Sequence, residues 1–144
     1  MAIKRLRDIK RSDDAAWRGV SRPKHMIHDD LEAFVWVTFY SIFIYTIKDL
    51  GVVDDPSEQQ ALKRQIVIKG LGDCFSYSTL EDLLRAKQSF VIGGVEVLEF
   101  IEDMNLRKVA VGVWELLFDQ NLPLGDPVLM THDSLCKVFV DAGA

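Results

Sequence analysis

The longest apolar stretch of the chain lies at residues 31–47 and reads LEAFVWVTFYSIFIYTI. Wound into a helix, this stretch is apolar on every face, and such a helix must be enclosed by other protein or by lipid. Asp29 and Asp30 precede it, and a carboxylate there is suited to cap a helix N-terminus and to sit at the positive end of the helix dipole. Gly51 follows as a common terminator. The pattern predicts a buried central helix over about 30–50.

Helical signals recur along the rest of the chain. Ser57 with Gln60 forms a capping-box pattern before a helix that we expect to reach about residue 69, and Ser78 with Glu81 forms another. Apolar residues then recur at helical spacing in three further segments, at 95–104, at 106–118 and from Thr131 or Asp133 to Gly143. The sequence therefore predicts an all-α fold with helices packed around the central one.

Size and composition favour one domain. The chain has 144 residues, of which 49% are hydrophobic and 27% charged, so it resembles a globular domain rather than a disordered tail. No repeat, low-complexity tract or internal linker is evident, and we interpret residues 1–144 as a single domain.

Two short strings carry a family resemblance. HDDLEAFVWVTF at residues 28–39 resembles the start of the long central helix in the C-terminal lobe of protein kinases, especially the H-D-L-E-S-F form of fungal-type protein kinases. Met1-Ala2-Ile3-Lys4-Arg5-Leu6 is similar to the F-M-A-x-E-x-L that ends their activation segment, and the two strings stand in the family's order. The resemblance implies a truncated kinase-like C-terminal lobe that begins at the end of the activation segment.

The resemblance also implies a role for Asp30, and the chain departs from the family pattern at two positions. In the family, the aspartate at this position faces into the lobe and hydrogen-bonds the backbone of the catalytic loop. Ala33 replaces the usual Ser, and Lys4 replaces a Glu that forms a buried ion pair with an Arg. That ion pair is therefore not expected here. Asp30 is the one site residue carried over, as a structural residue, and its capping role is the alternative.

The motifs of phosphoryl transfer are missing from residues 1–144. Kinases use a Gly-rich loop, a strand Lys paired with a helix Glu, a His-Arg-Asp loop and a metal-binding Asp-Phe-Gly. None of these strings occurs, and the glycines at 70, 72, 93 and 94 are interpreted as helix ends. We expect no catalysis by this chain, no catalytic residue and no cofactor.

Three functional hypotheses remain open. The first is a remnant or partial fungal-type serine/threonine kinase domain that is inactive alone and has a protein-interaction role. The second is an unrelated small helical interaction domain. The third is one part of a complete kinase whose catalytic portion lies upstream of Met1.

Charge is unevenly distributed along the chain. Residues 1–30 hold eight Lys and Arg against five Asp, whereas the remainder is strongly acidic and the net charge is −5. Nucleic-acid binding is therefore not expected, since the basic stretch lacks interleaved aromatic residues. Either this basic N-terminal stretch or an exposed apolar surface is the expected protein-binding feature.

Cysteine and histidine patterns indicate neither a metal site nor a secreted protein. Cys74 and Cys136 lie outside any metal-binding spacing, and the three histidines form no cluster with them. Met1 is followed by charge rather than by an apolar signal segment, so we expect an intracellular location.

A membrane span is not expected either. Residues 31–47 fall short of the ~20 that a bilayer crossing requires, and Glu32, Thr38, Ser41 and Thr46 interrupt them. A buried core helix is the preferred interpretation. If the surrounding layers are absent, the same helix becomes a membrane-adherent or aggregation-prone surface.

Overall fold

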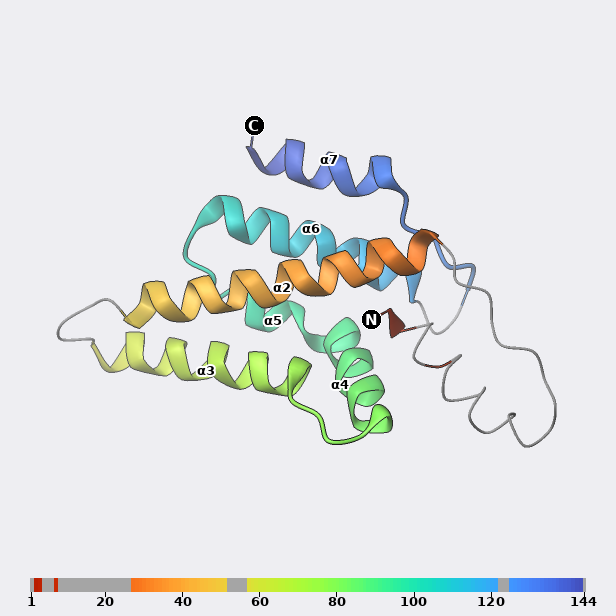
Figure 1. The fold of residues 1–144 in the computed structure, drawn as a ribbon. Helices are drawn as coiled ribbons and strands as arrows, with labels where there is room; N and C mark the ends of the chain where they lie inside the picture. The colour runs from red at the N-terminus through yellow and green to blue at the C-terminus, as the bar shows by residue number, and fades with distance from the viewer. Residues whose placement is uncertain (1, 4–6, 8–26, 52–56, 122–124, 144) are drawn as a thin grey trace.

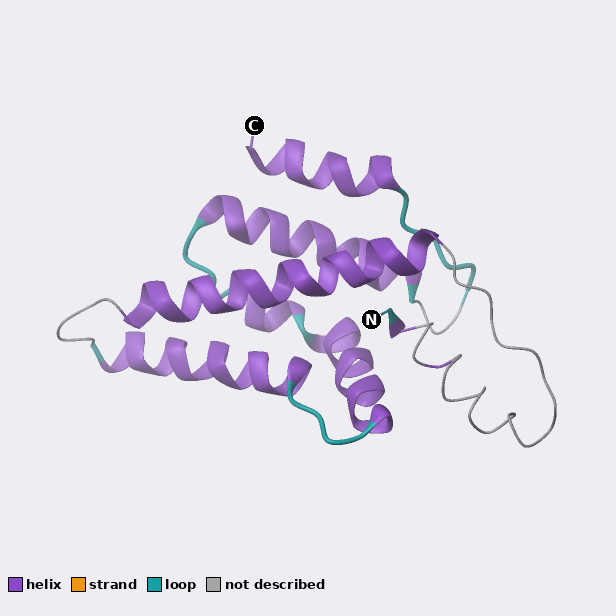
Figure 2. Cartoon of the chain, viewed as in Figure 1, coloured by secondary structure: helices purple, strands orange, loops and turns teal. Residues whose placement is uncertain are grey.

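The computed structural model describes residues 2–3, 7, 27–51, 57–121 and 125–143, and these contain helices but no strand (Figures 1 and 2). The expected all-α fold is confirmed over this part of the chain. The helices are α2 (Ile27–Gly51), α3 (Glu58–Phe75), α4 (Leu80–Gly93), α5 (Val95–Leu98), α6 (Met104–Gln120) and α7 (His132–Gly143).

The long helix α2 runs through the middle of the molecule, as expected for residues 30–50. It packs against α3 on one side and α6 on the other, and α7 packs on α6 (Figure 1). The aromatic centre of the core forms where α2 meets α4, because Trp36, Phe39 and Phe43 all contact the Phe90 ring. Phe39 and Phe43 are fully buried.

The helix starts follow the capping signals, with one shift. Ser57 and Gln60 form the expected capping box. The cap of α4 is Thr79 rather than Ser78, since the Thr79 side chain accepts a hydrogen bond from the Asp82 N–H. Thr131 accepts from the Ser134 N–H at the start of α7.

The prediction that both glycine pairs mark helix ends is wrong for the first pair. Gly93 ends α4 and Gly94 follows it, but Gly70 and Gly72 lie inside α3. A Cβ at Gly70 would lie 2.8 Å from the Val97 side chain, so the missing side chain lets α3 and α5 approach closely. Glycine inside a helix lowers the stability of that helix relative to alanine, and this contact offsets that loss.

The prediction that α2 is enclosed on every face needs correction. Its buried residues fall on one side, which we call the inner face: His28, Asp29, Glu32, Val35, Trp36, Phe39, Ile42, Phe43, Thr46 and Leu50. On the opposite side, Phe34 and Val37 are 51% and 62% exposed. The described helices cover only part of the circumference of α2.

By length and composition, α2 also passes the test for a membrane-spanning helix. A single helix of this kind is weak evidence for a membrane span, because the core helix of a globular protein passes the same test. The kinase-like string at residues 1–6 and the basic N-terminal stretch fall mostly outside the described residues, so Lys4 has no structural description.

Candidate functional site

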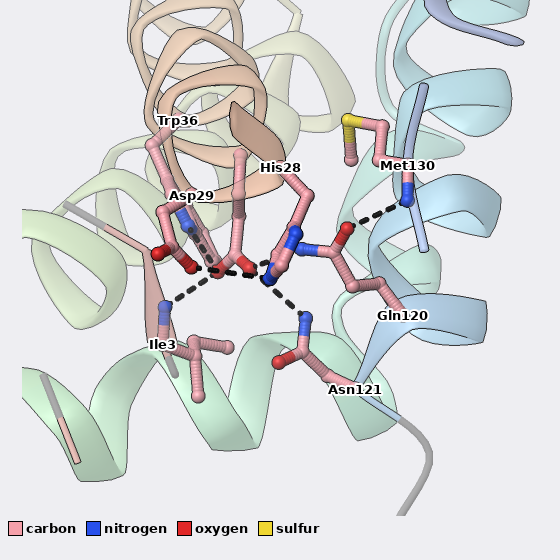
Figure 3. A network of polar contacts seen from close by, with 8 residues as sticks. Ile3, His28, Asp29, Trp36, Gln120, Asn121 and Met130 are labelled. Atoms are coloured by element: carbon pink, nitrogen blue, oxygen red, sulfur yellow. Dashed lines mark hydrogen bonds and ion pairs between the residues drawn. The ribbon is translucent and has the colours of Figure 1, made fainter. Parts of the chain in front are cut away.

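The most connected polar group of the described structure is the carboxylate of Glu32 on the inner face of α2. Glu32 is fully buried. One oxygen accepts hydrogen bonds from the Ile3 N–H at 2.6 Å and from the Trp36 indole at 3.3 Å. The other accepts from the side-chain amides of Gln120 at 2.7 Å and Asn121 at 3.4 Å (Figure 3). A buried carboxylate needs this many donors, because it leaves water on folding.

These contacts join segments that are far apart in the sequence. Ile3 precedes α2, whereas Gln120 and Asn121 stand at the end of α6. The Gln120 carbonyl oxygen also accepts from the Met130 N–H at 2.7 Å, which brings in the segment before α7 (Figure 3). Glu32 thus connects the chain start, the central helix and the lead into the last helix.

A buried lysine lies nearby. Lys87 of α4 is 3% exposed, and its ammonium lies 3.6 Å from the centroid of the Trp36 ring, a cation–π contact. Burial lowers the pKa of Lys87 to about 8, while Glu32 and then Cys74 act in the opposite direction. The ammonium is partly compensated by the ring and by the Glu32 charge.

Two further titratable groups are buried at the start of α2. The His28 Nε2 atom lies 3.6 Å from the Asp29 Oδ1 atom, and both side chains are buried. Within the described part of the chain, His28 Nε2 has no hydrogen-bond partner, whereas Asp29 has further interactions in the chain. Among the residues that the structure describes, no group of three His, Cys, Asp or Glu is placed to hold a metal ion.

The largest of the described cavities, about 790 Å³, lies between α3, α4 and α5. Its lining combines two carboxylates, Asp73 and Asp82, with the single cation Arg85 and with the Cys74 thiol. Burial raises the pKa of Cys74 to about 12, against an opposing effect of Lys87. Cys74 is therefore a protonated, inert thiol at neutral pH, because the thiolate is the nucleophile.

The outward side of α2 has a different character. Four of the five exposed large apolar residues of α2 and two of α7 form a set that we call the outer face: Ile27, Phe34, Val37, Tyr45, Phe139 and Val140. The fifth exposed residue of α2, Tyr40, packs on the Phe75 ring of α3 instead. The Phe34 and Phe139 rings lie 6.4 Å apart and connect the two helices. A continuous apolar patch on a protein surface is characteristic of an interaction site.

Asp30 lies in the first turn of α2 and is exposed, whereas Asp29 and Glu32 are buried. Because α2 begins at Ile27, the capping role expected for Asp30 is wrong by position: the residue is inside the helix. Asp30 has interactions within the chain. Its family-derived role requires a carboxylate that faces into the lobe, whereas the buried aspartate of the pair is Asp29. The role of Asp30 as a brace for a catalytic loop stays a prediction.

Sequence reasoning missed Glu32 and Lys87, although both carry a signal. Lys87 stands at the spacing of the buried Leu83, Leu84 and Val91 on α4, and Glu32 precedes Trp36 and Phe39 by one and two turns. A charge at a core position of a helical pattern indicates either a break in the pattern or a buried, paired group. Here both charges are buried.

In comparisons with known proteins, no family model, curated protein or solved structure matches the chain.

Proposed function

We propose that this domain is a non-catalytic helical interaction module, related to the C-terminal lobe of fungal-type protein kinases, that binds protein through the outer face of α2 and α7. The observation that carries the proposal is the exposure of aromatic and aliphatic side chains along a central helix, with Phe34 at 51%, Val37 at 62% and Val140 at 69%.

The size of the outer face supports binding. An aromatic side chain presents roughly 150–250 Å², and Phe34 and Tyr45 each leave about half of their surface in water. Together with Ile27, Val37, Phe139 and Val140, which are also exposed, the patch is on the order of several hundred Å². Patches of that size on single proteins are often functional.

The kinase relationship is supported by the two strings at residues 1–6 and 28–39 and agrees with an all-helical fold around one long apolar helix. The non-catalytic assignment is supported by the sequence, in which none of the kinase phosphate-binding or metal-binding motifs occurs. A kinase-like lobe without those motifs would act through its surface, by binding other proteins. A helical interaction domain unrelated to kinases would use the same outer face.

Site-specific photo-crosslinking tests the binding surface. A photoreactive phenylalanine analogue at Val37 is expected to cross-link the chain to a discrete protein, because Val37 is exposed on the outer face and lies away from both ends of α2. The matched control carries the analogue at Ile92 of α4, which is 70% exposed but belongs neither to α2 nor to α7. Equal cross-linking from both positions, or none from Val37, would contradict the proposal.

Thermal denaturation with increasing Mg-ATP tests the non-catalytic assignment. We expect no shift in the melting temperature, because the chain lacks the residues that would hold the phosphates and the metal. A saturable rise with ligand concentration, as linkage requires for specific binding, would overturn this part of the proposal.

A further inference from the structure

We infer that the partner bound by the outer face is a second copy of this chain, with the two α2 helices packed antiparallel about a two-fold axis. This inference rests on the proposed function, since it names the partner of the same surface.

The spacing of outward positions on α2 is that of a helix-packing seam. Successive residues are separated by four and three positions alternately, the heptad spacing that keeps side chains facing a partner helix. Ile44 is half-buried and the other five are exposed: Asp30, Phe34, Val37, Ser41, Ile44 and Lys48. Between the acidic Asp30 and the basic Lys48 at its two ends, the seam holds three apolar residues and Ser41.

The seam is complementary to itself only in the antiparallel direction. With the axis between Val37 and Ser41, Val37 faces Ser41 of the second copy and Phe34 faces its Ile44. Asp30 then faces Lys48 of the second copy, and two-fold symmetry produces this ion pair twice. A parallel arrangement would place Asp30 against Asp30 and Lys48 against Lys48, which like-charge repulsion disfavours.

Steric and charge features agree with this pairing. Ser41 is small, so it leaves room opposite Val37 at the centre, where the two helices are closest. The seam carries one negative and one positive side chain, so two copies can meet there although the chain as a whole has a net charge of −5. Asp30 also has interactions within its own chain, and the ion pair with Lys48 adds to them.

The seam fits a two-fold interface smaller than the standard one, which buries roughly 800 Å² on each partner. Of the six outer-face residues, Phe34 and Val37 lie in the seam itself. The half-buried Ile44 and the polar residues Asp30, Ser41 and Lys48 complete it. The crossing of α2 over α2 also brings Phe139 and Val140 of α7 close to the interface edge, since Phe139 contacts Phe34.

Sedimentation equilibrium of the purified full chain tests the inference. The expected mass is twice the 16.4 kDa of one chain at micromolar concentration, falling toward one chain on dilution. Val37→Glu places two like charges at the centre and is expected to give the single-chain mass, whereas Ile92→Glu on α4 keeps the double mass. Val37→Ser, a milder change with unaltered circular dichroism, is expected to weaken dimerisation at least several-fold.

A charge swap tests the orientation. Asp30→Lys and Lys48→Asp are each expected to weaken dimerisation by about tenfold, because both symmetric pairs become like-charge contacts. The double variant Asp30→Lys/Lys48→Asp restores both pairs and is expected to return to the wild-type dissociation constant. Failure of the double variant to recover excludes the antiparallel pairing.

The outcomes separate this inference from the proposed function. A single-chain mass at every concentration overturns the dimer, and a double mass that persists in Val37→Glu overturns the α2 seam as its interface. If the chain has the single-chain mass and Val37 cross-links a different protein, the dimer is wrong and the interaction module stands. A single-chain mass with no Val37 cross-link contradicts both.

Discussion

The inner face of α2 buries Phe39 and Phe43 completely, whereas the outer face of the same helix leaves Phe34 and Val37 51% and 62% exposed. The inner face also buries the ionisable Glu32, which has four hydrogen-bond donors from other parts of the helix and chain. On this helix, therefore, a charged residue is buried while one of the phenylalanines, Phe34, is exposed.

The difference shows that packing and hydrogen-bond partners, as well as hydrophobicity, decided which side is buried. Glu32 is inside because Ile3, Gln120 and Asn121 supply donors there. Phe34 is outside because only Phe139 reaches it among the rings of the described chain. A buried charge is tolerated where it is paired, and an exposed aromatic patch indicates a partner from elsewhere.

The largest expected contrast comes from matched phenylalanine truncations. Phe39→Ala should cost about 3–5 kcal/mol of unfolding free energy, because it removes a fully buried ring and leaves a cavity. Phe34→Ala, on the outer face, should cost about 1 kcal/mol or less. Urea denaturation at one low protein concentration measures both, and similar losses for the two variants would remove the distinction between the faces.

A smaller effect is expected at the buried carboxylate. Glu32→Gln keeps the side-chain volume but turns an NH₂ group toward donors such as the Gln120 and Asn121 amides, at a cost of about 1–3 kcal/mol. Glu115→Gln, at an exposed position of α6, is the control and should change stability by less than about 0.5 kcal/mol. Denaturant midpoints compare the two, and a silent Glu32→Gln would show that the network does not require a carboxylate.

The smallest effect is a pH dependence from the buried Lys87. Its pKa is about 8 in the folded chain against 10.5 for the free side chain, so above pH 8 the unfolded chain binds more protons and stability rises with pH. Above pH 9 the raised pKa of Cys74, about 12, has the opposite effect, because the folded thiol keeps its proton. The net gain is confined to pH 8–9 and is at most on the order of 1 kcal/mol.

Denaturant unfolding at pH 7, 8, 9 and 11 measures this profile. Lys87→Met keeps a long side chain over the Trp36 ring but has no ammonium to titrate, so the rise between pH 8 and 9 should disappear. If the rise persists in Lys87→Met, another group causes it.

Much of the helical organisation follows from the sequence. The long central helix, the capping box at Ser57 and the apolar spacing of residues 106–118 all correspond to helices of the structure. These features are local, because they depend on side chains within one or two turns of each other. The same local logic failed at Gly70, where the reason for a glycine is the close approach of Val97 from another helix.

The sequence by itself determined that residues 31–47 form an apolar helix that needs covering, but it did not reveal that the charged residues Glu32 and Lys87 are buried. Only the tertiary structure decided which side of that helix is covered, because coverage depends on where α3, α4 and α6 pack. It also decided that Glu32 meets Gln120, 88 residues away, since a long-range hydrogen bond leaves no periodic signal in the sequence. The α2 part of the outer face is the surface that those helices leave exposed.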